Sequence, residues 1–368
     1  MAITAYSKSF KRELDAEQLK RLFNDHLKDK NFAEFVKIDI ECPCCGVVGA
    51  RVVNESISPI SNIAVKQAHF AFKNNNGVDA HLVFCDYYSG QDSLIHVEKD
   101  SVINLSRSGN EVTEAIRKLV CSAIYNNYFN QSDIRNMRKW FYEMRSNQDI
   151  LVEYSKHQLN VLRKSIIRSK RNDEKYIVDK ELLKNDWFDL DEEVYESLAT
   201  NFMYPYDIRD INGLNYILSK KSIIRKAISL SKKNHGLYEF DRNRLDENYK
   251  LATRLSIYII NQNEFFYKKI GNSVAKARAN NPLMAYSATL LFVNNWDFKK
   301  SCQMHIDIIL STYADENLGN TIGLNPFIHY DAWIALSYSS KWSKRHIGFD
   351  FETEFEKEKE RLKILYGI

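Results

Sequence analysis

The sequence predicts an α+β protein in which a small, zinc-stabilised, β-rich N-terminal module precedes a large all-α helical region. Glycine and proline are scarce, with 12 Gly and 5 Pro in 368 residues, about 3% and 1% against usual frequencies near 7% and 5%. Because both residues interrupt helices, their scarcity favours a largely helical chain. Five glycines lie from Gly46 to Gly109 and none lies between Gly109 and Gly213, which places a boundary near residue 108.

Residues 31–108 are expected to form the β-rich module. Short runs rich in Val, Ile and aromatic residues alternate there with Asn, Gly and Ser, the pattern of short strands joined by turns. These runs are FVKIDIEC, GARVVN, AHLVFCDYY and SLIHVEKDSVINL. Before them, residues 10–29 carry an apolar stripe among charges, so residues 1–30 are predicted to hold an N-terminal helix.

Residues 109–368 are predicted to be all-α, in one or two subdomains with a break near residues 205–213. The segment after Asn110 has apolar residues at helical spacing, and Asn110 stands where an N-cap is expected. Ser132-Asp133 gives the same signal before a second helix. The segment FETEFEKEKERLKILY near the C-terminus has the charge density of a solvated terminal helix.

Composition excludes several classes of protein. Apolar residues make up 44% of the chain and charged residues 27%, the balance of a globular protein rather than a disordered or fibrous one. No apolar run approaches the roughly 18 residues of a membrane span, and the N-terminal MAITAYSKSFKRELDAEQLK becomes charged too early for a signal peptide. The sequence therefore predicts a cytoplasmic protein without membrane contact.

The hexapeptide ECPCCG carries the motif C-P-x-C-G, which points to metal binding. Its spacing lets the thiolates of Cys42 and Cys45 hold one tetrahedral ion from a single turn, and Gly46 permits the positive φ that such a turn needs. A second pair of ligands must follow downstream. His81 and Cys85 have the spacing of such a pair and are the preferred completion.

The third and fourth ligands stay open at this point. His69 is an alternative because the 35 residues between Cys45 and His81 make a long loop, and Cys44 is a spare thiol or a substitute ligand. Cys121 and Cys302 are interpreted as buried free thiols. A disulfide is disfavoured in a chain without an export signal. The predicted cofactor is Zn²⁺, and four protein ligands would make the site structural.

The order C-P-x-C-G, a β segment, His69-Phe70 and a further His/Cys pair resembles the zinc-binding N-terminal region of CoiA-like competence proteins. In those proteins a His-Phe-x-His element follows the Cys pair. The resemblance covers residues 42–85, and it departs from the pattern at Phe72, which stands where the second His would be. Because those proteins are associated with a nuclease-like domain, the resemblance implies contact with DNA and a bacterial or phage-related setting such as antiviral defence.

No catalytic residue is predicted. Asp86 with Glu98 and Lys99 comes nearest to a nuclease motif, but the last two are adjacent and would point to opposite faces of a strand. The acidic run from 186 to 196 fits a solvated helix N-terminus better than a metal site. His305-x-Asp307 is interpreted as a structural histidine, and the absence of a P-loop motif excludes P-loop nucleotide hydrolysis.

The net charge is +4, but the basic residues are unevenly distributed. Residues 156–184 hold nine Lys or Arg against four acids, and residues 220–233 hold six with no acid. In the second segment an apolar helical face leaves the cations solvated, where they could meet phosphates. The residues expected to bind nucleic acid are Arg168, Lys170, Arg171, Lys221, Arg225 and Lys232.

The sequence therefore predicts a zinc-stabilised, non-catalytic protein that binds nucleic acid, with DNA as the expected form, as one component of a larger assembly with protein partners. Two alternatives stay open. One is a metal-dependent nuclease whose acidic residues come from distant positions. The other is an adaptor whose helices bind proteins only.

Overall fold

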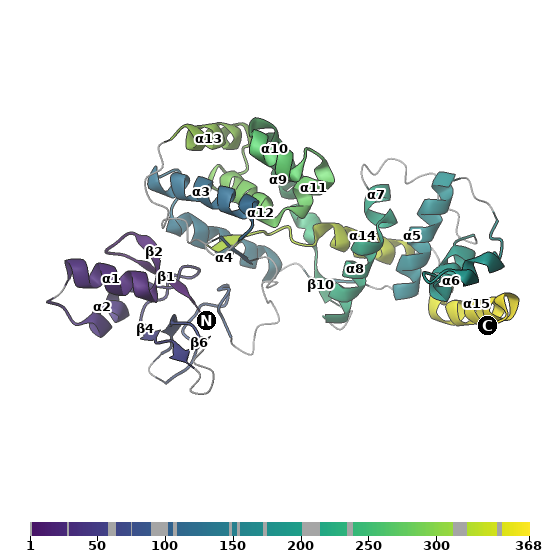
Figure 1. Ribbon diagram of the computed structural model, residues 1–368, viewed down its shortest axis with the longest axis horizontal. Helices are drawn as coiled ribbons and strands as arrows, with labels where there is room; N and C mark the ends of the chain where they lie inside the picture. The colour runs from purple at the N-terminus through teal and green to yellow at the C-terminus, as the bar shows by residue number, and fades with distance from the viewer. Residues whose placement is uncertain are drawn as a thin grey trace. The chain divides into compact units, whose positions relative to one another are not determined.

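The structure is a computed structural model that describes residues 2–27, 29–57, 64–74, 76–89, 102–105, 109–146, 149–152, 155–171, 175–200, 214–233, 238–311, 322–343 and 348–368. The chain is mostly helical with small antiparallel sheets, which confirms the α+β expectation at that level (Figure 1). Two compact units are formed: unit 1 is Met1–Asn147 with Arg244–Ile328, and unit 2 is Gln148–Asn243 with His329–Ile368. The expected boundary at residue 108 and break at 205–213 lie outside the described residues.

Unit 1 begins with a hairpin that the sequence analysis did not predict. Strands β1 (Thr4–Ser7) and β2 (Arg12–Asp15) pair antiparallel, and β3 (Ile40–Glu41) pairs with the other edge of β1. Helix α1 (Ala16–His26) follows β2 directly because the Asp15 side chain accepts two backbone amides of its first turn in a capping box. The N-terminal helix is therefore shorter than predicted and starts later.

Helix α2 (Phe32–Asp39) occupies most of the first run predicted as a strand. The side chain of Asn31 accepts a hydrogen bond from the backbone N–H of Glu34 at 3.1 Å, which satisfies one of the free donors at the helix N-terminus. Only β3 stays extended at the end of FVKIDIEC. The strand prediction for that run was wrong because the local cap stabilises a helix instead.

Two further hairpins complete the N-terminal part of the described chain. Strand β4 (Ala50–Val53) pairs antiparallel with β7 (His69–Phe72), and β5 (Ser56–Ile57) pairs with β6 (Ala64–Lys66). Strand β4 lies in the predicted run GARVVN, whereas β5, β6 and β7 lie outside the four runs that the sequence analysis predicted as strands.

Strand β8 (Val102–Asn104) pairs with β11 (Ile322–Leu324) rather than with the N-terminal strands. This pairing joins segments far apart in the sequence, and β11 also contacts the central helix of unit 1. The pairing is long-range, so no local pattern could predict it.

Helix α12 is buried among other helices of unit 1. Helix α12 contacts helices on several sides and has buried residues along its whole length, as expected for a helix that is apolar all round. The helices are α3 (Glu111–Tyr125), α4 (Gln131–Ser146), α9 (Asp246–Gln262), α10 (Glu264–Ile270), α11 (Val274–Ala279), α12 (Asn281–Val293) and α13 (Phe298–Leu310).

Capping residues fix where these helices begin. Asn110 caps α3 as predicted, since its side chain accepts from the backbone of Val112 and Thr113. The cap of α4 is Asn130, two residues before the predicted Ser132. Asn130 Oδ1 accepts from Ser132 N at 2.8 Å, and Asp133 Oδ2 accepts from Asn130 N at 2.8 Å. Ser132-Asp133 therefore lies inside the first turn of α4.

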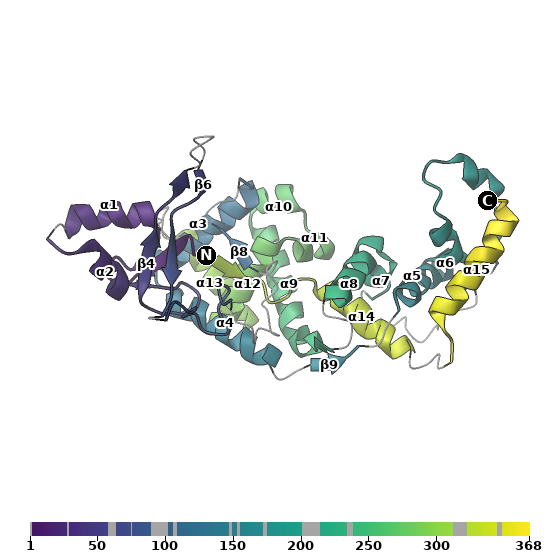
Figure 2. The same cartoon turned by 90° about the horizontal axis from the view of Figure 1, so that it is seen from below.

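Among the described residues, unit 2 contains six helices, one two-stranded antiparallel sheet and two short 3₁₀ segments, the second of which ends in unit 1. Helices α5, α6 and α15 pack together (Figure 2), and α15 spans the predicted terminal helix. The elements are α5 (Lys156–Arg171), α6 (Leu190–Ala199), α7 (Leu214–Ser219), α8 (Lys221–Lys233), α14 (Tyr330–Ser343), α15 (Phe351–Tyr366), β9 (Asp149–Leu151), β10 (Tyr238–Phe240) and 3₁₀ turns at Lys180–Lys184 and Arg242–Leu245.

Each unit has its own apolar core. In unit 2 the core includes Leu159, Leu162, Val194, Trp333 and Leu336. Among the residues described, no helix combines the length and the apolar composition that crossing a bilayer requires.

The Asn110 cap makes a direct test of local stability possible. Asn110→Ala removes the acceptor for Val112 N and Thr113 N, so the free energy of unfolding should fall by about 1 kcal/mol. Asn110→Asp keeps a side-chain oxygen and should retain most of that stability. Urea unfolding followed by circular dichroism measures both, and equal losses in the two variants would contradict this account of the cap.

Candidate metal centre

The first half of the centre is the tight turn that follows β3. Its backbone is closed by Gly46 N–H, which donates to Cys42 O at 2.9 Å, and by Cys42 N–H, which donates to Val47 O at 2.9 Å. Gly46 has φ +75°, and a Cβ there would also lie 3.2 Å from Arg135 Nη1. Both observations explain glycine at this position, and the turn directs Cys42 and Cys45 to the same side.

The second half comes from the segment AHLVFCDYY, which forms turns and not the predicted strand. Cys85 N–H donates to Leu82 O at 2.9 Å, and Tyr88 N–H donates to Cys85 O at 3.0 Å. In a strand, His81 and Cys85 would stand about 13 Å apart. The turns bring His81 Nδ1 to 3.4 Å from Cys85 Sγ. The prediction of a strand over AHLVFCDYY was therefore wrong, since a strand could not bring these two side chains together.

The two halves meet in one group of four ligand atoms. Cys42 Sγ lies 3.6 Å from Cys85 Sγ, Cys45 Sγ lies 3.6 Å from His81 Nδ1, and all four atoms lie within 4.8 Å of one another. A tetrahedral zinc ion with ordinary bond lengths would separate two sulfurs by about 3.8 Å and a sulfur from a nitrogen by about 3.6 Å. The spacing of these residues therefore fits a single four-coordinate metal ion.

The structure brings together the four ligands that the sequence analysis preferred. The alternative, His69, lies on β7 and its Nδ1 is 3.0 Å from Gln67 O, outside the four-atom group. His96, a further histidine of the same stretch, lies outside the described residues. Neither Cys121 nor Cys302 forms a disulfide; Cys121 is buried as interpreted, whereas Cys302 is only half-buried.

The protonation of the thiols shows what a cation would add. Burial raises the pKa values of Cys42 and Cys85, while hydrogen bonds with these two thiols hold the pKa of Cys45 below its ordinary value. One thiolate is therefore already favoured, and a divalent ion supplies the charge that the other two need to lose their protons.

Helix α4 holds the backbone of the first turn. Gln131 Nε2 donates to Pro43 O at 2.5 Å, and Arg135 Nη2 donates to Cys42 O at 3.0 Å. Arg135 Nη1 also pairs with Glu41 Oε2 at 2.8 Å. The carbonyl groups of the turn are thus fixed by side chains from a helix some ninety positions later in the chain, which keeps both cysteines in place.

A buried ion pair links α4 to the second half of the centre. Arg138 donates to Asp86 Oδ2 from Nε and from Nη2, both at 3.0 Å, and Cys44 Sγ donates to the same oxygen at 3.3 Å. Burial disfavours the charged form of Arg138, but the Asp86 carboxylate raises its pKa above the ordinary range. Cys44 is not one of the four grouped ligands. It is not a spare thiol either, because its side chain connects the first turn to Asp86 in the second half of the centre.

The sequence analysis missed this second layer of residues. Gln131, Arg135 and Arg138 are spaced i, i+4 and i+7, so they share one face of α4. Gln131 and Arg138 are buried. The sequence does carry a signal for these residues. Polar residues repeat at helical spacing on a helix that also has an apolar stripe, which indicates a second face that packs against other parts of the chain.

A buried acid also lies in this part of unit 1. Glu13 on β2 is buried, accepts a hydrogen bond from Thr4 Oγ1 through one carboxyl oxygen, and has no partner for Oε2 among the described residues. Burial raises the pKa of Glu13 to about 8. Glu13 is therefore mainly protonated at neutral pH.

The six predicted nucleic-acid contacts do not form one described surface. Arg168 is buried, pairs with Glu196 at 3.5 Å and donates to a backbone carbonyl at 2.7 Å. Lys221 pairs with Glu192 at 2.5 Å, and Arg225 is exposed on α8. The side chains of the remaining three predicted contacts lie outside the described part of the chain: Lys170, Arg171 and Lys232.

The acidic run of unit 2 is explained by ion pairs and capping. Asp189 caps α6, and Glu192 pairs with Arg163 and Lys164 of α5 as well as with α8. Glu192 has its pKa lowered to about 2, because these cations outweigh the opposing effect of burial. Among the described residues, the group of Cys42, Cys45, His81 and Cys85 is the one that could hold a metal ion.

The residues considered for catalysis have structural partners. Asp86 is buried against Arg138, while Glu98 and Lys99 lie outside the described residues. His305 is fully buried, with Nδ1 3.2 Å from Tyr286 Oη, and burial lowers its pKa to about 4. Its neighbour Asp307 accepts from Gln303 instead, which agrees with a structural histidine.

Comparisons of the chain with models of protein families, with curated proteins and with solved structures gave no match. The resemblance to CoiA-like proteins, and the DNA contact and defence setting that it implies, therefore stay predictions. The arguments for function rest on the residues of this chain alone.

The ligand assignment predicts opposite outcomes for two substitutions. Cys45→Ser should reduce bound metal well below one equivalent and lower the thermal midpoint, because the group loses one of its four donors. His69→Ala should keep a full equivalent, because His69 lies outside the group. Elemental analysis of the purified proteins measures the bound metal. A full equivalent of metal in Cys45→Ser would show that Cys45 is not a ligand.

Glu13 predicts a pH dependence of stability. Its folded-state pKa of about 8 lies above the ordinary value of 4.5, so the folded state holds the proton more tightly. The contribution of Glu13 to the free energy of unfolding should therefore be greatest below about pH 4.5 and should fall between there and pH 8, by up to about 1.4 kcal/mol per pH unit. Glu13→Gln cannot ionise and should remove this part of the slope. Urea unfolding across that range tests it, and an unchanged slope would contradict it.

Proposed function

We propose that Cys42, Cys45, His81 and Cys85 hold one structural Zn²⁺, and that the chain is a non-catalytic, nucleic-acid-binding protein. The closed set of four protein ligands is the observation that carries the first half of this proposal. A catalytic zinc ion keeps one position open for water, whereas a structural one does not. Three thiolates and an imidazole also favour zinc over magnesium or calcium, which prefer oxygen ligands.

The proposed role of the ion is to join the turn after β3 to the turns after β7. The core around these segments is small, and it includes the ligand cysteines themselves, Cys42, Cys45 and Cys85. Metal binding then contributes folding free energy that apolar burial alone does not supply. No residue here is assigned a step in catalysis.

The nucleic-acid half of the proposal rests on the positive net charge and on helix α8. Ile224, Ala227 and Leu230 of α8 are buried in the core of unit 2, while Arg225 is exposed. An amphipathic helix with outward cations is a favourable contact for phosphates. Helix α5 is a weaker choice than the sequence indicated, because Lys164 and Arg168 are engaged by α6.

DNA as the bound form, membership of an assembly and a defence setting belong to the same proposal. They are supported only by the sequence, through the resemblance of residues 42–85 to CoiA-like proteins. The nuclease alternative is disfavoured. Asp86, the acidic residue that came nearest to a nuclease motif, is buried in an ion pair with Arg138.

A specific observation favours a second candidate function, which is protein binding by unit 2. Three large apolar side chains of this unit are strongly exposed: Ile177 at 81%, Trp187 at 70% and Ile364 at 80%. Exposed apolar groups of this size are typical of interaction surfaces when they gather into a patch. This candidate replaces the first if no nucleic acid binds.

Binding of fluorescent single- and double-stranded DNA and RNA across a range of salt concentrations tests the leading proposal. We expect submicromolar affinity at physiological salt and a steep fall as salt rises, because released counterions drive phosphate contacts. Arg225→Glu should weaken binding to all sequences and lower the magnitude of the salt slope by about 1.

The matched control is Lys299→Glu, which makes the same charge change at an exposed residue of α13 in unit 1. It should leave the salt slope unchanged. Absence of binding below tens of micromolar for every nucleic acid would overturn the proposal and favour the adaptor. Binding with equal losses in both variants would place the contact elsewhere than α8.

A further inference from the structure

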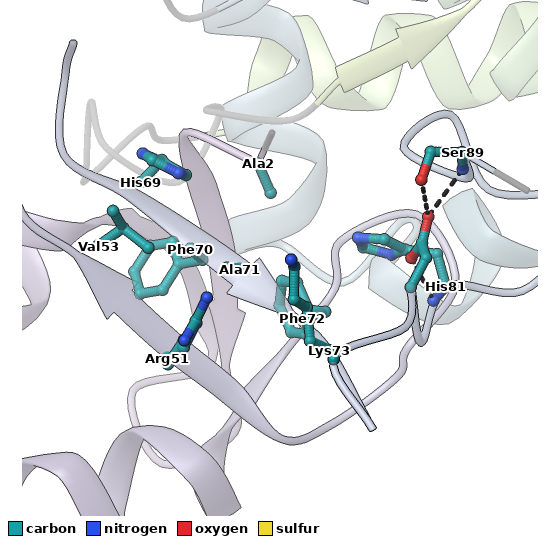
Figure 3. Close-up of a pocket in the computed structure, with 12 residues that line it drawn as sticks. Ala2, Arg51, Val53, His69, Phe70, Ala71, Phe72, Lys73, His81 and Ser89 are labelled. Carbon is teal, nitrogen blue, oxygen red and sulfur yellow. Dashed lines mark hydrogen bonds between the residues drawn. The ribbon is translucent and has the colours of Figure 1, made fainter. Parts of the chain in front are cut away.

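A cleft of about 420 Å³ lies on the outer face of the β4–β7 hairpin, beside the metal centre (Figure 3). It is separate from the helices considered above. Its lining combines cationic, small and apolar residues, and it reaches the metal ligand His81. The lining residues used here are Arg51, His69, Ala71, Lys73, Asp79 and His81.

The register of the hairpin places the cationic residues on one face. Arg51 stands opposite Ala71, and Val53 stands opposite His69. Because side chains alternate along a strand, these four residues and Lys73 share the outer face. The other face of β7 is turned to the core, where Phe70 and Phe72 are buried.

Ala71 leaves space at the centre of this face. Its methyl group lies between His69 and Lys73 on the same strand and opposite Arg51, and diagonal neighbours on a hairpin are about 7 Å apart. Nitrogen donors at such spacing can surround one tetrahedral anion. The cleft is larger than a single phosphate, so it also accommodates atoms attached to one.

The charges that face the cleft favour an anion. Arg51 and Lys73 are exposed, and neither forms an ion pair within the described part of the chain. The single acidic residue of the lining is Asp79, and its oxygens are occupied: Oδ1 accepts from His81 N at 2.9 Å, and Oδ2 accepts from Ser89 N and Oγ at 2.7 Å. These donors keep the Asp79 carboxylate ionised, so two cations, Arg51 and Lys73, face one carboxylate and the charged residues of the lining carry a net charge of +1.

His81 also lines the cleft, and its ring packs against Phe72 with a centroid distance of 5.2 Å. Its Nδ1 faces the cysteine sulfurs, so Nε2 carries the proton, and no acceptor for Nε2 lies among the described residues. A metal-bound histidine ordinarily donates its second N–H to an oxygen acceptor. Because the His81 ring lies against Phe72 on the core side of β7, His81 is not among the proposed anion contacts.

We infer that this cleft binds a phosphate group of a nucleic-acid backbone, with Arg51 and Lys73 as its charged contacts. The inference rests on the proposed nucleic-acid-binding function. It places one phosphate contact at the β4–β7 hairpin beside the proposed metal site, and not on the basic helices. A neutral or cationic ligand would not balance the net charge of +1 that Arg51 and Lys73 leave against Asp79. Free phosphate offers the same chemistry, so the experiment includes it as a separate arm.

The test uses the full chain and a labelled single-stranded thymidylate oligonucleotide of about 20 nucleotides, titrated across salt. The double variant Arg51→Ala/Lys73→Ala should bind at least about tenfold more weakly, with a salt slope smaller by about 1.4 for two lost contacts. Lys299→Ala/Lys300→Ala removes two exposed charges from α13 and serves as the matched control. Metal content and thermal midpoint should be the same in all three proteins.

Each outcome decides between the two proposals. If the double variant binds the oligonucleotide like the wild type, the cleft is not a backbone site and the proposed function stands without it. If the wild type binds duplex DNA or RNA but not the oligonucleotide, the proposed function stands and the backbone assignment of the cleft fails; if it binds no nucleic acid at all, both fail. If millimolar inorganic phosphate raises the thermal midpoint of the wild type but not of the double variant, while no oligonucleotide binds, the cleft takes free phosphate and the backbone assignment is overturned.

Discussion

The convergence of four ligand atoms from two distant turns is the constraint on which the N-terminal part of the molecule depends. Cys42 and Cys45 must face His81 and Cys85 across less than 5 Å, and neither turn is part of a regular element that could hold it there. Extended backbone at His81 would carry the ligands apart, so the segment that looks like a strand in the sequence has to bend.

Helix α4 turns this local constraint into a connection with the helices of unit 1. Its polar face binds the carbonyl groups of the first turn through Gln131 and Arg135, and its Arg138 forms a buried ion pair with Asp86 next to a ligand. A buried pair contributes little net stability, because both ions lose their hydration, but it fixes one geometry strongly. The composition of the chain changes near residue 108, whereas the packing continues through α4 and the pairing of β8 with β11.

The sequence predicts features that depend on residues close together in the chain better than features that depend on contacts between distant residues. The α3 cap at Asn110, the terminal helix α15 and the four preferred ligands depend on residues a few positions apart or on ligand chemistry, and these agree with the structure. Helix α2 was misjudged because a single cap at Asn31 outweighed the β-branched residues that follow. The second layer around the metal was missed because its contacts span about fifty to ninety positions, which no local pattern records.

Unit 2 shows why a count of basic residues does not locate a binding surface. The positive segment 156–184 looks favourable for phosphates, yet Arg163, Lys164 and Arg168 face Glu192 and Glu196 of α6, which neutralise them. A phosphate that displaced these carboxylates would leave them unpaired in a partly buried setting, which costs free energy. Cations without such partners are the better contacts. Arg51 and Lys73 form no ion pair among the described residues and share a concave site with one carboxylate, Asp79, so this cleft beside the Cys/His group is a stronger choice than the longest basic run.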